Sequence, residues 1–196
     1  NALYYDPEKE EILDFHNGMD DIAERKLVMI GNAAERYQED PVRILRAIRL
    51  SGKLGFELSQ ATVGPIAESI GRLKHEPVAR LFDEIMKLLF SGHARECLKR
   101  LKEFDVPDDI HPLFNALNIS DGMDGKMIGL ALKNTDERLR ADKSVSVGFV
   151  LAALMWPELN RHWKVNLQQG LKPSHALSEA MNTLRDTVER GWGVPQ

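Results

Sequence analysis

The stretch EDPVRILRAIRLSGKLGF, residues 39–56, predicts a helix with two well-marked ends. Proline is favoured at the first position of a helix, and the residue before a proline avoids helical dihedral angles. We therefore expect Asp40 to be the N-cap of a helix that runs from Pro41 to about Leu54. Gly55 follows at the position where helices commonly end in a left-handed residue. The helical pattern continues from here toward the C-terminus.

The two faces of this predicted helix differ in charge. Residues three apart form one slanted stripe, because each residue of a helix advances by about 100°. The stripe here consists of Asp40, Arg43, Arg46 and Arg49. The face that packs against the protein consists of Leu45, Ile48, Leu50 and Leu54. The simplest interpretation is a solvated basic face. The use of arginine rather than lysine favours a second interpretation, a face that binds phosphates or base edges. A planar guanidinium recognises these groups, whereas an ammonium binds them only as a point charge.

The whole chain is predicted to be mainly α. Before residue 32 it contains short β-type runs, ALYY, EILDF and KLVMI, with the turn-forming DPEKE between the first two. After residue 32 the pattern predicts about eight or nine helices. Besides 41–54 they are expected near 33–38, 60–72, 77–90, 93–104, 109–117, 126–141, 146–156 and 174–190, and 158–169 is a further helical stretch apart from these. We expect a β segment over 1–31, followed by an all-α array.

Composition is that of an ordinary soluble globular protein. The 196 residues are 43% hydrophobic and 29% charged, with a net charge of −4. The single cysteine, Cys97, has no partner for a disulfide and no metal-ligand spacing, which predicts an inert packed thiol in a cytoplasmic protein. The apolar run VGFVLAALMW at 147–156 is far shorter than the ~20 residues of a membrane span. NALYYD has neither an initiator Met nor a signal-peptide pattern, so we expect a piece of a longer protein.

The arginine stripe lies in a motif that resembles a known family. RYQEDPVRILRAIRLSGKLGF, residues 36–56, is similar to the neck-helix motif of class II nucleotidyltransferases, which include CCA-adding tRNA nucleotidyltransferases and bacterial poly(A) polymerase. The family pattern is E-D-x-x-R, then L-R-A-x-R-F and L-G. Leu50 alone departs from it, at the position of the family's aromatic residue.

Further motifs extend the resemblance over the whole chain. NALYYD resembles the end of the family's R-R-D-F-T-x-N-A motif. LDFHNGMDDI resembles the loop that follows it, with Asn17 where the family usually has glycine. ARLFDEIMKLLFSG, LKNTDERL and AALMWPEL are similar to the body of bacterial poly(A) polymerase. The resemblance implies that 1–31 is a remnant of the catalytic head domain, 32–106 the neck and 107–196 the helical body.

The resemblance implies that Asp40 and Arg43 read the base of the incoming nucleotide. An aspartate only accepts hydrogen bonds and an arginine only donates them, so the pair complements a base that offers an amino donor beside a ring-nitrogen acceptor. Adenine and cytosine both present this pair of groups, so the two residues cannot choose between them. Each unpaired buried donor or acceptor costs about 1–3 kcal/mol, which disfavours uracil and guanine.

Other candidate residues have less specific roles. The further nucleotide-binding candidates are Arg46, Arg49 and Asn1, and the supporting candidates are Glu39, Arg80 and Glu84. We expect Arg46 and Arg49 to hold Asp40 or to reach a phosphate, and Asn1 to contact the triphosphate. The alternative for Arg80 and Glu84 is a simple ion pair one helical turn apart. Trp156, Trp163 and Trp192 stand near apolar helix ends and are expected in the core rather than stacked on RNA.

We expect no metal site and no catalytic residue in this chain. Nucleotidyl transfer uses two metal ions held by carboxylates, which in the family lie upstream in the head domain. The acidic residues Asp6, Asp14, Asp20 and Asp21 stand at turn positions, where carboxylates commonly bind the backbone. The histidines show no HxxxH or HExxH spacing.

The predicted function is therefore that of the neck and body of a poly(A) polymerase. The full-length parent would add AMP from ATP to RNA 3′ ends with Mg²⁺, and the fragment alone is expected to be inactive. The alternative within the family is a CCA-adding tRNA nucleotidyltransferase. An alternative of another class is a non-catalytic helical RNA-binding or adaptor module. RNA and ATP are the expected partners, and no membrane is expected.

Overall fold

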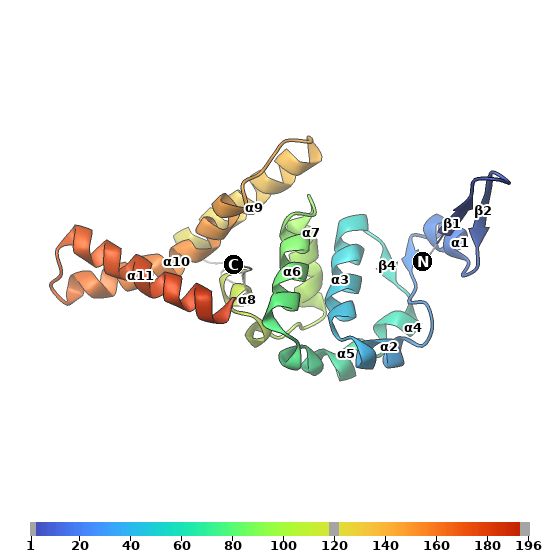
Figure 1. The fold of residues 1–196 in the computed structure, drawn as a ribbon, viewed down its shortest axis with the longest axis horizontal. Coiled ribbons are helices and arrows are strands. Elements are labelled where there is room, and N and C mark those ends of the chain that lie inside the picture. Colours follow the sequence, from blue (N-terminus) through green and yellow to red (C-terminus); the bar gives the residue numbers. More distant parts are fainter. Residues whose placement is uncertain (1–2, 118–121, 193–196) are drawn as a thin grey trace. The chain divides into compact units, whose positions relative to one another are not determined.

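The computed structural model describes residues 3–117 and 122–192 (Figure 1). The chain divides into two compact units, each built from two segments. The first unit contains Asn1–Glu76 and Glu96–Pro107, and the second contains Pro77–Arg95 and Asp108–Gln196. Within the described residues the protein is mainly α, with two small sheets of two strands each, as the sequence predicts.

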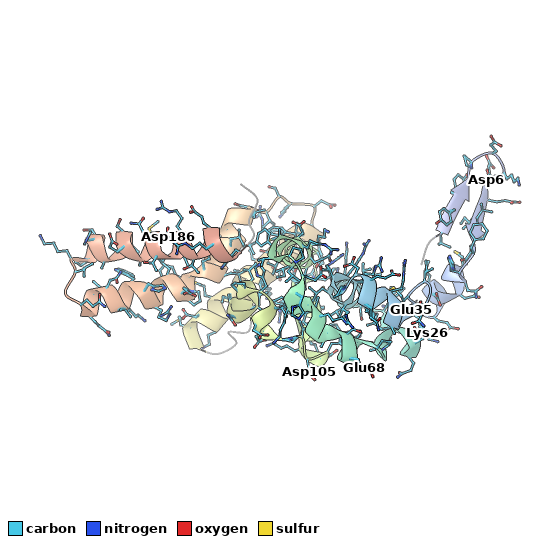
Figure 2. All side chains as sticks on the ribbon, turned by 60° about the horizontal axis from the view of Figure 1, so that its bottom comes forward. Asp6, Lys26, Glu35, Glu68, Asp105 and Asp186 are labelled. Carbon is cyan, nitrogen blue, oxygen red and sulfur yellow. The ribbon has the colours of Figure 1, made fainter. Side chains whose placement is uncertain are left out.

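The first unit opens with an antiparallel hairpin of β1 (Leu3–Asp6) and β2 (Glu11–Asp14). The Asp6 carboxylate accepts hydrogen bonds from the backbone N–H groups of Glu8 (2.9 Å) and Lys9 (3.3 Å), which closes the turn between the strands. Figure 2 labels Asp6 at the far end of this hairpin. The predicted β character of this segment is confirmed.

A short helix, α1 (Gly18–Ala23), follows where the sequence predicted a loop. The Asp14 carboxylate accepts hydrogen bonds from the backbone N–H groups of Gly18 (2.7 Å) and Met19 (2.8 Å). It thus satisfies donors that the first turn of a helix leaves unpaired. These hydrogen bonds, Met19 first, hold the pKa of Asp14 below its ordinary value.

The second sheet joins segments that are far apart in the sequence. β3 (Lys26–Leu27) pairs in parallel with β4 (Glu57–Leu58), a strand that the sequence did not predict. The backbone N–H groups of Glu57 and Ser59 donate to the carbonyls of Arg25 (3.0 Å) and Leu27 (2.9 Å). This pairing places the KLVMI segment beside the end of the helix that carries the arginine stripe.

The helices α2 (Ala33–Glu39) and α3 (Val42–Leu54) confirm the helices predicted over 33–38 and 41–54. The expectation that Asp40 is the N-cap of α3 was wrong, because Pro41 is the N-cap and its side chain makes no capping hydrogen bond. Pro41 already has helical dihedral angles, with φ −59° and ψ −24°, whereas Asp40 is extended, with φ −150°. Gly55 ends α3 with φ +63°, a left-handed conformation that glycine adopts without strain.

The buried face of α3 differs in one respect from the prediction. Leu45 and Ile48 are buried, but Leu54 is 44% exposed. The expectation that Leu54 packs in the core was wrong, because the next turn of α3 is buried instead through Ser51 and Gly52. Gly52 lies against Cys97 of α7 (Ala94–Glu103), where an added Cβ would be 2.6 Å from the Cys97 Cα.

Residues 60–75 do not form the single helix that the sequence predicted. They form α4 (Gln60–Val63), α5 (Ile66–Ser69) and the 3-10 helix η1 (Ile70–His75). The break falls at Gly64-Pro65, where proline has no N–H to continue the helical ladder. The Ser59 hydroxyl caps α4 by accepting from the Thr62 backbone N–H.

The second unit is entirely helical within its described residues. It contains α6 (Val78–Leu89), the 3-10 helix η2 (Asp108–Ile110), α8 (Pro112–Leu117), α9 (Gly122–Arg140), α10 (Val147–Gln168) and α11 (Pro173–Gly191). The sequence predicted two helices over 146–169, but α10 continues through Pro157 without a break. Figure 1 shows α10 and α11 side by side, and the fully buried Ala176 and Ala180 let the two helices approach closely.

The LKNTDERL motif supplies a cap for the start of α7. Asp136 is buried, and its carboxylate oxygens accept hydrogen bonds from the backbone N–H groups of Ala94 (2.8 Å) and Arg95 (3.3 Å). Both donors belong to the first turn of α7 and have no partner within that helix. Asp136 therefore joins α9 to the start of α7 through a helix N-cap made across the fold.

We predict that Asp136→Ala lowers the free energy of unfolding by about 0.5–2 kcal/mol, the usual cost of losing a helix cap. Asp136→Asn keeps one acceptor oxygen and is expected to cost less. Urea denaturation followed by circular dichroism measures both, with Glu137→Ala at the exposed neighbouring position as the control. Equal stability of the alanine variant and the unchanged protein would contradict the capping role.

His111 is a buried polar residue of the second unit. Its Nδ1 accepts a hydrogen bond from the Leu113 backbone N–H at 3.1 Å, so its Nε2 carries the proton and donates to the Trp192 carbonyl at 3.1 Å. Burial lowers the pKa of His111, against a smaller opposite effect of the bond to Trp192. Protonation would place a second donor opposite the Leu113 N–H. The neutral ring is therefore the form that fits.

We predict that the second unit loses stability as the pH falls below about 6.5, the ordinary pKa of histidine. The folded pKa of His111 lies below the unfolded one, so between the two values the unfolded chain binds more protons. Thermal melts between pH 8 and pH 5 should show a loss that His111→Asn reduces. His175→Gln, at an exposed position of α11, is the control. The same acid sensitivity in His111→Asn would refute this.

Candidate functional site

A cavity of about 430 Å³ lies within the first unit, next to α3. It is bounded by α2, α3, the segment around β3, β4 and α4. The lining residues are Leu27, Val28, Met29, Ile30, Arg36, Arg43, Arg46, Ala47, Leu50, Leu58 and Thr62. Three arginines thus face a wall that is almost wholly apolar. Such a combination suits a ligand with a flat apolar part and a charged or polar edge.

The local structure explains how these residues meet. Arg43, Ala47 and Leu50 stand four and three residues apart on α3, so they share one face of the helix. The β3–β4 pairing brings Leu58 next to Leu27 on the opposite side of the cavity.

Thr62 holds the segment after β3 in place. Its hydroxyl accepts a hydrogen bond from the Met29 backbone N–H at 2.8 Å. Its carbonyl accepts another from the hydroxyl of Tyr37, at 2.9 Å. Tyr37 is fully buried, and burial raises the pKa of its hydroxyl to about 12, so it remains a donor at neutral pH. The apolar wall is therefore anchored to both α2 and α4.

Arg43 is held by a small network at the junction of α2 and α3. Its Nη1 donates to the Glu39 Oε2 at 2.9 Å and to the Arg36 carbonyl at 2.9 Å. Arg36 Nη1 donates to the same carboxylate oxygen of Glu39 at 3.2 Å. The hydrogen bond from Arg43, followed by the attraction of Arg36, lowers the pKa of Glu39. Glu39 therefore remains an anion and fixes the position of both guanidinium groups.

The predicted pair Asp40 and Arg43 does come together. Asp40 Oδ2 lies 3.9 Å from Arg43 Nε, and both side chains are partly buried. Asp40 is not among the residues that line the cavity, whereas Arg43 is. The pair therefore stands at the edge of the cavity, at the start of α3. Its proposed role in reading a base stays a prediction.

The other two arginines of the stripe diverge. Arg46 is exposed and lines the cavity. Arg49 is not a lining residue, and its backbone carbonyl accepts a hydrogen bond from the Cys97 thiol at 3.3 Å. Cys97 is buried, as the sequence predicts. The contribution of Arg49 to nucleotide binding stays a prediction.

The supporting candidates lie in different parts of the chain. Glu39 holds Arg43, as described above. Arg80 and Glu84 belong to α6 of the second unit, where Glu84 is buried and forms an ion pair with Lys87 at 3.0 Å. The proposed roles of Arg80 and Glu84 stay predictions. Asn1 lies outside the residues that the structure describes.

Two aspartates near the start of the first unit bind the backbone. Asp6 closes the β1–β2 turn and Asp14 caps α1, which confirms the expectation for these two residues. Asp20 and Asp21 lie in the first turn of α1, where a negative charge is favourable. Within residues 3–117 and 122–192, no group of three or more histidine, cysteine, aspartate or glutamate side chains could hold a metal ion. In the same residues, no helix has the length and apolarity needed to cross a bilayer.

Sequence reasoning missed Arg36 and the apolar wall of the cavity. Arg36 has a signal in retrospect, because it precedes Glu39 by three residues within α2, a spacing at which side chains on one helix meet. Its Nε is buried and has no hydrogen-bond partner among the described residues, although Arg36 borders the cavity. The wall had no such signal, since it depends on the pairing of two-residue strands.

Comparison with known proteins finds relatives among the RNA nucleotidyltransferases. Poly(A) polymerase I of Salmonella typhimurium is 35% identical over 199 residues, an alignment that includes 100% of this chain and 43% of that protein. The chain is thus similar to poly(A) polymerase I along its whole length. It spans less than half the length of the curated relatives that it matches. A family model described as "Probable RNA and SrmB- binding site of polymerase A" matches residues 55–117.

Other relatives cover less of the chain or are more distant. A CCA-adding enzyme of Bacillus cytotoxicus is 38% identical over 96 residues, 49% of this chain and 24% of that enzyme. A solved tRNA nucleotidyltransferase, complexed with a primer tRNA and an incoming ATP analog, covers 92% of this chain and 63% of its own, with a TM-score of 0.53 and 21% identity. At this identity the structural likeness shows the fold alone.

Proposed function

We propose that this chain is the neck and body of an enzyme that adds AMP from ATP to RNA 3′ ends. The observation that carries the proposal is the arginine-lined cavity beside Asp40 and Arg43, at the E-D-x-x-R motif. The similarity to poly(A) polymerase I along the whole chain supports it. ATP and the 3′ end of an RNA are the proposed partners, and the cytoplasm the proposed location.

The cavity offers complementary groups for an adenine nucleotide. Its volume of about 430 Å³ falls in the usual range of small-molecule pockets, about 300–1,000 Å³. We place the flat face of the base against the apolar wall around Met29 and Leu58. Asp40 would accept from the amino group of the base, and Arg43 would donate to the neighbouring ring nitrogen.

Two further groups complete the proposed site. The Glu39–Arg36 network holds the Arg43 guanidinium before the nucleotide arrives, which lowers the entropy cost of binding. Arg46, exposed beside the cavity, is placed to attract the triphosphate, to which arginine donates in a bidentate manner.

The described residues do not fit the proposed cofactor Mg²⁺. Mg²⁺ takes oxygen ligands in octahedral geometry, usually with one or two carboxylates and substrate phosphates. The carboxylates of Asp6 and Asp14 are committed to backbone N–H groups, and Asp6 stands at the far end of the hairpin (Figure 2). We therefore derive no step through the metal, and assign to this chain only the binding and selection of the nucleotide.

A CCA-adding enzyme is the second candidate, because the Asp40–Arg43 pair accepts cytosine as well as adenine. A polymerisation assay on the intact protein, with ATP and CTP supplied separately, distinguishes the two. We expect repeated addition of AMP to an RNA 3′ end and little use of CTP. Efficient incorporation of CTP into a tRNA that lacks CCA would overturn the assignment. RNA binding without incorporation of either nucleotide would favour a non-catalytic adaptor.

A further inference from the structure

An apolar groove runs between α9 and α10 in the second unit, in a part of the chain that the cavity does not involve. Its volume is about 820 Å³. Its large side chains face solvent: Met123 is 83% exposed, Leu130 67%, Phe149 50% and Trp156 38%. The expectation that Trp156 is a core residue was therefore wrong. Contiguous exposed apolar surface of this kind commonly marks an interaction site.

The spacing of the lining residues indicates what shape the groove accepts. On α9, Met123, Met127 and Leu130 are four and three residues apart and form one stripe. On α10, Phe149 and Trp156 are seven residues apart, or two turns, with Ala153 between them. Both walls thus repeat with the helical period.

Small residues also line the groove. Ala131 of α9 and Ala152 and Ala153 of α10 line it. Alanine lets the backbone of a third helix approach closely, while the larger side chains contact the sides of that helix. The lining of α9 extends from residue 123 to residue 137, which is about 21 Å at the rise of an α-helix. A partner helix of about 14 residues matches this length.

The rim of the groove indicates the charge of its partner. Lys126 and Lys133 stand seven residues apart on α9 and border the same side of the apolar stripe. Lys126 forms no ion pair with any residue that the structure describes. Lys133 lies 3.8 Å from Glu137, and both are more than half exposed, so this pair is weak. The rim therefore carries two positive charges two turns apart, at Lys126 and Lys133, and one negative charge, at Glu137.

We propose that the α9–α10 groove binds an acidic amphipathic helix of another protein. Its apolar stripe enters the groove at i, i+3/i+4 and i+7 spacing, and carboxylates two turns apart meet Lys126 and Lys133. Methionine and alanine favour a helix over single-stranded RNA, which is bound mainly by aromatic platforms and a continuous cationic track. The inference does not rest on the proposed enzymatic function.

Two synthetic helical peptides of about four turns test the proposal. Both carry leucines at i, i+3/i+4 and i+7, flanked by glutamates in one and by lysines in the other. Their binding to the whole chain is followed by anisotropy of a dye on the peptide. We expect the acidic peptide to bind at least about tenfold more tightly. Equal affinity of the two would overturn the proposal.

Substitutions in the chain locate the binding surface. Leu130→Glu is expected to lower the affinity for the acidic peptide by about tenfold or more. Met181→Glu, at an equally exposed apolar position of α11, is the matched control and should leave affinity unchanged. Lys126→Glu with Lys133→Glu should reverse the preference toward the basic peptide. Circular dichroism confirms that each variant is folded.

Three other results would refute the proposal. Unchanged peptide affinity in Leu130→Glu would place the peptide elsewhere. Binding of an oligoadenylate that Leu130→Glu and Trp156→Ala abolish would assign the groove to RNA. A concentration-dependent dimer that Leu130→Glu dissociates would assign it to a second copy of this chain.

Discussion

In the intact protein, replacing Arg43 by alanine is expected to lower the selectivity for ATP over UTP and GTP by about tenfold to a hundredfold. The estimate follows from the cost of about 1–3 kcal/mol for an unpaired buried hydrogen-bonding group. Arg43 lies at the cavity edge, where Glu39, the Arg36 carbonyl and Asp40 hold its guanidinium in one orientation. The incorporation of each nucleotide, supplied alone, measures the effect.

Two further variants make this prediction specific. Arg43→Lys keeps the charge but loses the planar fork, so it should retain affinity for the triphosphate and still lose discrimination. Arg72→Ala, at an exposed position of η1 outside the cavity, is the matched control. Normal selectivity in Arg43→Ala would contradict the proposed role of the cavity. Unfolding of that variant would instead favour a structural role for the arginine, as would a selectivity loss shared by Arg72→Ala.

Replacing Gly52 by alanine is expected to destabilise the first unit by about 1–3 kcal/mol. Replacing a glycine inside a helix by alanine normally stabilises the helix by up to about 1 kcal/mol. Here the new Cβ would lie 2.6 Å from the Cys97 Cα and 2.8 Å from the Cys97 N. Backbone atoms cannot rotate away as a side chain can, so α3 and α7 must separate. Urea denaturation measures the loss.

The control for Gly52 is another helical glycine. Gly129 of α9 has nothing within 4 Å of an added Cβ, so Gly129→Ala should stabilise the chain. Adding Cys97→Ala to Gly52→Ala removes the sulfur at 3.0 Å but not the backbone contacts, and should restore little stability. A stabilising Gly52→Ala would show that the α3–α7 contact is not tight.

The helical framework followed from local signals that the structure confirms. Asp40-Pro41 and Gly55 mark the ends of α3 because both depend on the dihedral preferences of single residues. The errors came where tertiary contacts override such preferences. Pro157 does not end α10, which packs along α11. The Gly64-Pro65 break was a local signal that the prediction of a helix over 60–72 overlooked.

The candidate site was predicted only on its charged side. The regular spacing of Arg43 and Arg46 along one helix can be read directly, and both line the cavity. The apolar wall could not be predicted, since β3 and β4 are two residues long and separated by 29 residues of chain. No period exists over two residues, so no pattern could reveal their pairing.

The β3–β4 pairing also sets an order in which the cavity forms during folding. Contacts within and between α2 and α3 are local, whereas the wall requires closure of the loop between Leu27 and Glu57. Loop closure costs entropy before any contact offsets it, so the helices should form first. Folding intermediates would then carry the arginines without the apolar wall, and would attract polyphosphates without distinguishing their bases.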